Sequence, residues 1–161
     1  LIDSNLTGVS FVGAKLTGRY TREGYYSRGA NLTRCILKGA DFSQADCHGA
    51  DIADADLRDS NLSNANLIET DLKRVNLSGA NLTGANLSES NLRKAILTGA
   101  NFKDVKLSET KLTGVDLSQV VNLCPKEVSL AIIDKKTKVP DSLEILWTSD
   151  DTFECKSVSL S

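Results

Sequence analysis

Large apolar residues recur at every fifth position along most of this chain. From Leu32 to Leu117 the position holds Leu, Phe, Ile or Cys eighteen times in succession. The residue two places earlier is small, usually Ala, and the residue one place earlier is mostly Asn or Asp. A helix face repeats every 3.6 residues and a strand face every two, so neither keeps this pattern on one side. The period predicts a chain that turns a corner every five residues and stacks into a solenoid.

The five-residue spacing slips once, near the N-terminus. Four earlier apolar residues keep the interval but lie one residue out of phase: Leu1, Leu6, Phe11 and Leu16. The slip falls across residues 19–29, RYTREGYYSRG. We interpret this segment as an inserted bulge or loop within a repeat region that covers residues 1–122.

Residues 123–161 lack the repeat, and a solenoid end needs a cover over its apolar ladder. Pro125 suits the first turn of a helix. Asp141, followed by Glu144 three residues later, resembles the start of a second helix with a capping box. Such a helix would place Trp147 over the last coil. We therefore expect a small C-terminal helical cap over residues 123–161.

Four stretches carry the repeat most clearly: ADFSQ, ADLRD, ANLIE and ANLTG. They resemble the A(D/N)LXX motif of the pentapeptide-repeat family, and the resemblance covers residues 1 to about 122. It implies an all-β solenoid, namely a right-handed quadrilateral β-helix with four pentapeptides per coil. The chain also looks like the exported members of cyanobacteria and chloroplasts, which reside in the thylakoid lumen or periplasm and have no established activity. The absence of methionine fits a processed mature chain or a fragment.

Four cysteines divide into two pairs. Cys35 takes a small-residue position and Cys47 a central apolar position, so both are expected to point inward, either as buried free thiols or as a pair that bridges the core. Cys124 and Cys155 lie near the two ends of the cap, and we predict a disulfide between them that ties the tail to the rod. Such a bridge would imply an oxidising compartment. There is no CxxC pair and only one histidine, so no metal or cofactor is expected.

The sequence offers little that could support catalysis. The sole histidine, His48, follows a central residue and is expected at the surface. No phosphate-binding GxxxxGK[ST] or GxGxxG sequence occurs. A regular rod also lacks the concave site in which catalytic groups converge. We therefore predict that the protein is not an enzyme.

Charged residues at equivalent positions of successive coils stack on one face of a four-sided rod. Glu69, Glu89 and Glu109 form an acidic ladder, although their position in the repeat requires no acid. Arg74 and Lys94 stack on the next face, joined by Lys73 and Arg93. Like charges about 5 Å apart repel, so the fold itself does not favour an acidic ladder. We therefore predict that the ladder belongs to an interaction surface, together with Arg74, Arg93 and Lys94.

Two other features have two readings each. The aspartates Asp41, Asp46, Asp51 and Asp56 ring one coil, either as backbone hydrogen-bond partners in the motif or as a protein or cation docking surface. The 19–29 insertion concentrates Tyr20, Tyr25 and Tyr26 among arginines. These tyrosines either anchor an interface or pack over the rod where the coil is broken.

The charge balance limits the partners. The net charge is −2, and residues 1–122 hold 14 acidic and 14 basic residues, so no nucleic-acid footprint is expected. No apolar run is long enough to cross a membrane. We predict a non-enzymatic scaffold or protein-binding module, monomeric or weakly dimeric, with an unidentified protein partner. The alternative is the family's DNA-mimicking inhibitor of DNA gyrase or topoisomerase, for which this balanced charge is a poor match.

Overall fold

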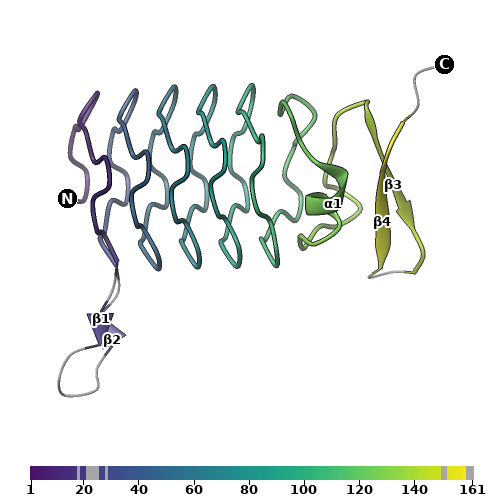
Figure 1. Cartoon of the computed structure of the whole chain (residues 1–161), viewed down its shortest axis with the longest axis horizontal. Coiled ribbons are helices and arrows are strands. Elements are labelled where there is room, and N and C mark those ends of the chain that lie inside the picture. The colour runs from purple at the N-terminus through teal and green to yellow at the C-terminus, as the bar shows by residue number, and fades with distance from the viewer. Residues whose placement is uncertain (18, 21–25, 28, 150–151, 159–161) are drawn as a thin grey trace.

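The structure is a computed structural model that describes residues 1–17, 19–20, 26–27, 29–149 and 152–158. Figure 1 shows a row of stacked coils followed by a short helix and a pair of strands at the C-terminal end. Two further strands, β1 (Arg19–Tyr20) and β2 (Tyr26–Ser27), form an antiparallel hairpin that projects from the N-terminal end of the row. The chain is thus a rod with an additional element near each end.

Successive coils pair through the backbone at a constant spacing. Parallel bridges join Asn31 to Asp51, Asp51 to Asp71 and so on, with the same offset along most of the rod. Four pentapeptides therefore make one coil, which confirms the predicted solenoid. The first coil is longer, because Asn5 pairs with Ile36. Its excess over the other coils matches the length of the 19–29 segment.

Each corner of the coil is a turn that ends on a small residue. The N–H of Ala40 donates to the carbonyl of Leu37 at 3.0 Å, and the third residue of this turn, Gly39, has φ +65°. Such a positive φ suits Gly and Asn, as in type II turns. Other corners hold larger residues in the same conformation, among them Arg74 with φ 59° and Glu109 with φ 56°.

The Asn or Asp side chain of each repeat bonds to backbone and to its neighbours in the stack. Asp41 Oδ1 accepts the N–H of Ser43 at 2.9 Å, and Asn66 Nδ2 donates to Asp46 Oδ1 at 2.8 Å. All four aspartates of the ring accept the N–H two residues on. These contacts favour the backbone reading of the aspartate ring over a docking surface.

The core is a set of stacks of large apolar side chains, most of them leucine. One stack is fully buried and consists of Leu37, Leu57, Leu77, Leu97 and Leu117. The small-residue position is equally buried, and where it holds a hydroxyl the side chain can bond to a carbonyl, as Ser60 Oγ does to Leu57 O at 2.7 Å. Cys35 and Cys47 are buried in this core, as predicted.

The cap is not the predicted pair of helices. The helix α1 covers only Pro125–Val128, and the segment expected to be helical after Asp141 is instead the strand β3 (Leu143–Trp147). It pairs antiparallel with β4 (Phe153–Ser157). The helical cap was therefore a wrong prediction for residues 141–147.

The burial of β3 explains this outcome. Leu143, Ile145 and Trp147 alternate with exposed residues, which is the period of a strand and not of a helix. The same alternation places Cys155 on the inner face of β4. Packing one apolar face against α1 outweighs the local capping-box signal, because tertiary contacts override helix propensity.

Between α1 and β3 the chain continues the rod. Ile132 bridges Lys111 and Lys138 bridges Asp116, at offsets slightly longer than those of the regular coils. Coil-to-coil pairing thus extends past residue 122, up to which the repeats were predicted.

Side-chain oxygens replace backbone acceptors that a further coil would supply. The N–H of Leu107 donates to Glu127 Oε2 at 3.0 Å, and the N–H of Gly114 donates to Asp134 Oδ1 at 2.8 Å. Unpaired strand groups at a solenoid end would otherwise invite pairing with another chain. The cap therefore satisfies the end of the hydrogen-bond ladder as well as covering the core.

Ser90 provides a test of the core. Its hydroxyl is fully buried and has no hydrogen-bond partner among the described residues, whereas Thr110 Oγ1 donates to the carbonyl of Leu87. We expect Ser90→Ala to raise the free energy of unfolding by about 1 kcal/mol, because an unsatisfied buried hydroxyl is removed. Ser60→Ala, which breaks a formed hydrogen bond, should lower it by a similar amount. Chemical denaturation followed by circular dichroism measures both; equal effects at the two positions would contradict the assignment.

Asp116 makes stability depend on pH at the cap. Hydrogen bonds from Ser118 and then from Lys138 hold the pKa of this carboxyl at about 2, below the usual 3.8. A depressed folded-state pKa stabilises the fold above the unfolded value, and this contribution is lost as pH falls toward 2. Asp116→Asn should therefore lower the thermal midpoint near neutral pH, and the deficit should shrink as pH falls toward 2. Asp104→Asn is the matched control, and a deficit of Asp116→Asn that persisted undiminished in acid would contradict this origin.

Candidate functional site

The acidic ladder predicted from the sequence lines a shallow hollow on one side of the rod. Glu69, Glu89 and Glu109 come from equivalent corners of three successive coils, and Lys111 and Ile132 complete the lining. The hollow has a volume of about 270 Å³. Ile132 is 41 % exposed and adds an apolar surface to the charged side chains. The structure therefore brings the three glutamates together beside a cation and an exposed isoleucine.

The backbone is left-handed at each glutamate of the ladder. Glu69, Glu89 and Glu109 have φ of 56°, 61° and 56°. This region costs an L-residue roughly 1–2 kcal/mol. One coil before Glu69 the same column holds Gly49, also with a positive φ, and glycine adopts this conformation without that cost. The same conformation occurs at other corners that hold large residues, such as Arg74 and Lys94, so it belongs to the corner geometry of the rod.

The basic side chains on the next corner differ in their hydrogen-bond and ion-pair partners. Arg74 donates through Nε and Nη2 to both carboxylate oxygens of Asp54. That bidentate hydrogen bond lowers the pKa of Asp54 and raises the pKa of Arg74. Arg93 Nε donates to Thr113 Oγ1 at 3.0 Å. Lys94 forms no ion pair among the described residues, so Arg74 has a structural partner whereas Lys94 is exposed with its charge unpaired.

One contact at the ladder could not be predicted from the repeat pattern. His48 Nε2 lies 3.5 Å from Glu69 Oε1, which places the only histidine at the end of the acidic ladder. The repeat stacks equivalent positions of successive coils, whereas these two residues hold different positions in their repeats. The predicted surface position of His48 is otherwise correct, since about a third of its side chain is exposed.

The tyrosine-rich insertion is described only in part. Tyr20 pairs with Tyr26 across the hairpin β1–β2 through the backbone, and Tyr25 lies outside the described residues. Its role as an interface stays a prediction.

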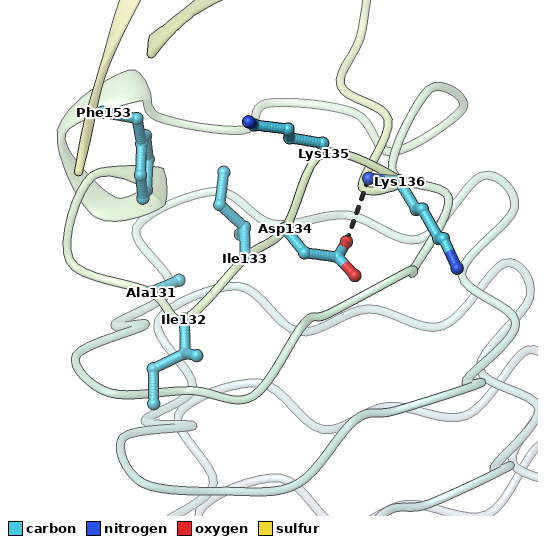
Figure 2. Close-up of a pocket in the computed structure, with 7 residues that line it drawn as sticks. All are labelled: Ala131, Ile132, Ile133, Asp134, Lys135, Lys136 and Phe153. Carbon is cyan, nitrogen blue, oxygen red and sulfur yellow. Dashed lines mark hydrogen bonds between the residues drawn. The ribbon is translucent and has the colours of Figure 1, made fainter. Parts of the chain in front are cut away.

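A second and larger hollow lies where the last coil meets the cap. Figure 2 shows Ile133, on the segment after α1, extending toward the side on which Phe153 of β4 lies, whereas the side chain of Ile132 points away from Phe153. The volume is about 590 Å³. Phe153 also contacts Trp147, with ring centroids 5.3 Å apart. Sequence reasoning missed this hollow because it depends on a hairpin that was predicted to be a helix.

The carboxylate that lines this second hollow, that of Asp134, accepts several hydrogen bonds from neighbouring residues. Asp134 Oδ1 accepts N–H donors from Gly114 and, as Figure 2 shows, from Lys136, and it also bonds to Thr137. Burial would raise the pKa of Asp134, but these hydrogen bonds outweigh it and lower the pKa. The carboxylate therefore fixes a turn and is not poised to transfer protons.

The cysteines at the cap are thiols in this structure. Cys124 is exposed and Cys155 is buried. Burial, followed by the nearby Cys124, raises the pKa of Cys155. The predicted disulfide is thus not formed here, and its residues lie in the same region of the cap.

Within the described residues no group of three or more His, Cys, Asp or Glu side chains could hold a metal ion. In that same part of the chain, no helix is both long and apolar enough to span a bilayer. The arrangement is suited to binding through charge and apolar contact.

Strain at the ladder can be measured at a single corner. Glu109→Gly should raise the free energy of unfolding by up to about 1 kcal/mol, since glycine relieves the left-handed strain and loses part of that gain to chain entropy. Ser108→Gly, one residue earlier and without a positive φ, should lower it by about 0.5–1 kcal/mol. Thermal unfolding of both variants checks the opposite signs, and a loss of stability in both would refute strain at Glu109.

Several proteins of known structure resemble this chain over part of its length. Among them, HetL, a pentapeptide repeat protein involved in heterocyst differentiation regulation from the cyanobacterium Nostoc, is 34 % identical over 74 % of this chain, with a TM-score of 0.39. The chain spans only 54 % of HetL. No curated protein matches the chain in sequence.

Two further structures are similar over larger shares of their own chains. A pentapeptide repeat protein from the Arabidopsis thaliana thylakoid lumen is 30 % identical, covering 66 % of this chain and 70 % of that one, with a TM-score of 0.27. QnrB1, a plasmid-mediated fluoroquinolone resistance protein, is 20 % identical, covering 85 % and 70 %, with a TM-score of 0.37.

The family evidence comes from the repeats themselves. The sequence model described as pentapeptide repeats matches eight copies, in segments 28–59, 50–88, 60–99 and 80–119. These segments together cover more than half of the chain, and they coincide with the coils that pair at a constant offset. The chain therefore belongs to the pentapeptide repeat family.

Proposed function

We propose that this protein is a non-enzymatic scaffold that binds a protein partner through the face carrying Glu69, Glu89 and Glu109. The observation that carries the proposal is the stacking of three like charges on left-handed corners around one hollow. Glycine, as at Gly49 in the same column, would let these corners fold at lower cost. Other corners also hold large residues with a positive φ, so the proposal rests on the like charge of the three stacked glutamates, which the fold does not require.

The neighbouring residues support a protein partner over a small ion. Ile132 offers exposed apolar area at one end of the hollow, and Lys111 adds a positive charge within its lining. Lys94 and Arg93 lie on the adjoining corner and extend the charged surface. A partner that fits would present basic side chains toward the ladder and an apolar group toward Ile132, because interfaces combine an apolar contact with a charged rim.

A polyanion mimic of DNA is the weaker function. Such a mimic needs a strongly negative surface, whereas the coils carry as many basic as acidic residues. The carboxylate of Asp54 is also neutralised by Arg74 from the next coil. The rod therefore presents mixed charge, which suits selective recognition of a protein surface.

The proposal includes an exported location, in the thylakoid lumen or periplasm. It rests on the prediction from the sequence that Cys124 and Cys155 form a disulfide in an oxidising compartment, whereas both are thiols in this structure. A monomeric or weakly dimeric rod leaves the ladder face open to the partner.

Affinity capture from the native compartment, followed by calorimetric titration of the captured protein, tests the surface. The variant Glu69→Gln/Glu89→Gln/Glu109→Gln should bind its partner about tenfold more weakly or worse, because charges at an interface steer and orient the complex. Rising ionic strength should reduce the difference from the unmodified protein. A partner held equally by both forms would place the binding surface elsewhere.

The matched control changes three acids that lie away from the ladder. Asp59→Asn/Asp104→Asn/Glu144→Gln alters the net charge by the same amount and should keep the partner. Equal losses in the two triple variants would indicate a non-specific charge effect and contradict the ladder as the site.

A further inference from the structure

Two cysteines lie in the region where the cap joins the rod. Cys124 precedes α1, and its carbonyl accepts the N–H groups of Glu127 and Val128 at 3.1 and 3.2 Å. Cys155 occupies the middle of β4 and packs in one apolar cluster with Val128 and Leu143. The first turn after Cys124 therefore lies directly against the strand that carries Cys155.

Further contacts hold the residues around Cys124 against the strand that carries Cys155. Ser129 Oγ accepts the N–H of Cys155 at 3.2 Å, which ties β4 to the residue following α1. Leu123 packs against the same cluster from the other side of Cys124. The neighbours of Cys124 on both sides thus contact the surroundings of Cys155. The electrostatic influence of Cys124 on the pKa of Cys155 agrees with this, because such an influence weakens with distance.

We propose that Cys124 and Cys155 are a redox-active pair that closes to a disulfide and staples the β3–β4 hairpin to the end of the rod. This site is separate from the acidic ladder and does not depend on the proposed partner. Its substrate class is a low-molecular-weight disulfide such as oxidised glutathione.

The chemistry balances as two successive exchanges. The thiolate of Cys124 attacks one sulfur of oxidised glutathione, forming a mixed disulfide and releasing one glutathione thiolate. The thiolate of Cys155 then attacks the Cys124 sulfur, which forms the protein disulfide and releases the second glutathione. Two cysteine thiols are oxidised, one glutathione disulfide is reduced to two thiols, and the two cysteine protons pass to the departing thiolates through solvent.

Exposure assigns the order of the two steps. Cys124 is exposed and meets the reagent, while Cys155 is buried and its pKa is raised. Once Cys124 is in the mixed disulfide it carries no negative charge, so its contribution to the raised pKa of Cys155 disappears. Cys35 and Cys47 are buried in the rod core, and burial raises the pKa of Cys47 to about 12, which keeps its thiol unreactive.

The bond would act on the least anchored element of the cap. A two-stranded hairpin is marginal by itself, and β3–β4 is held through Val128, Leu143 and Cys155 on its inner face. Phe153, at the start of β4, borders the larger hollow. Fixing Cys155 to Cys124 holds this wall of the hollow in place.

The experiment treats the whole chain with oxidised glutathione under non-denaturing conditions, followed by peptide mapping without reduction. We expect one intramolecular crosslink between the peptides of Cys124 and Cys155, with Cys35 and Cys47 remaining thiols. The oxidised protein should unfold about 5–10 °C above the reduced protein, in line with closure of a loop of this length. Dithiothreitol should reverse both changes.

Single variants distinguish the proposed order from chance oxidation. Cys155→Ala should stop at a stable glutathione adduct on Cys124, whereas Cys124→Ser should remain unmodified and keep its thermal midpoint after treatment. Because Cys124 is exposed, we expect Cys124→Ser to fold normally. The fluorescence of Trp147, which contacts Phe153, checks that the hairpin is intact in each variant. A stable adduct on Cys124 in the unmodified protein, without the crosslink, would overturn the proposal.

Discussion

Backbone hydrogen bonding between coils at a constant offset is the constraint on which the rest of this molecule depends. It places each residue over the equivalent residue of the previous coil, so that like positions share one environment. Leucines then stack on leucines inside, and asparagine amides bond to the carboxylate or amide of the neighbouring coil, as Asn66 does to Asp46. The same register aligns Glu89 with Glu69, so surface chemistry is arranged in columns along the rod.

The register also determines which positions of the repeat accept different residue types. Inward positions are filled by a few side chains of fixed size, because backbone from adjoining coils leaves no space. Corner residues need a positive φ but their side chains point to solvent, so a large residue there is sterically free and only conformationally costly. Arg74 offsets that cost with a bidentate bond to Asp54, whereas Glu89 and Glu109 have no such ion pair among the described residues. Lys94 likewise has a positive φ and no ion pair among the described residues, so what distinguishes the ladder is its stack of like charges around one hollow.

Most of the rod could be predicted from the sequence, because the position of a residue within its five-residue repeat indicates whether its side chain is buried. Cys47, for example, occupies the central position and is buried. The cap was harder, since it occurs once and its local signals conflict. Asp141 with Glu144 indicated a helix, while the alternation of apolar residues in the same segment indicated a strand. The candidate site, too, could be predicted only in part. The stacking of its glutamates follows from spacing, but their positive φ depends on corner geometry, and the contact between His48 and Glu69 joins unlike repeat positions.

The end of the rod shows why a solenoid concentrates its vulnerability in one place. Inside the stack every coil is held from both sides, whereas the last coil is followed by the irregular chain after α1 and takes two of its acceptors from the side chains of Glu127 and Asp134. The hairpin beyond it packs through a small apolar cluster that includes Cys155. Free energies of local opening are lowest where buried contacts are few, so the cap would open before the coils do. A covalent link from Cys124 to Cys155 crosses that boundary, where a single bond changes local stability most.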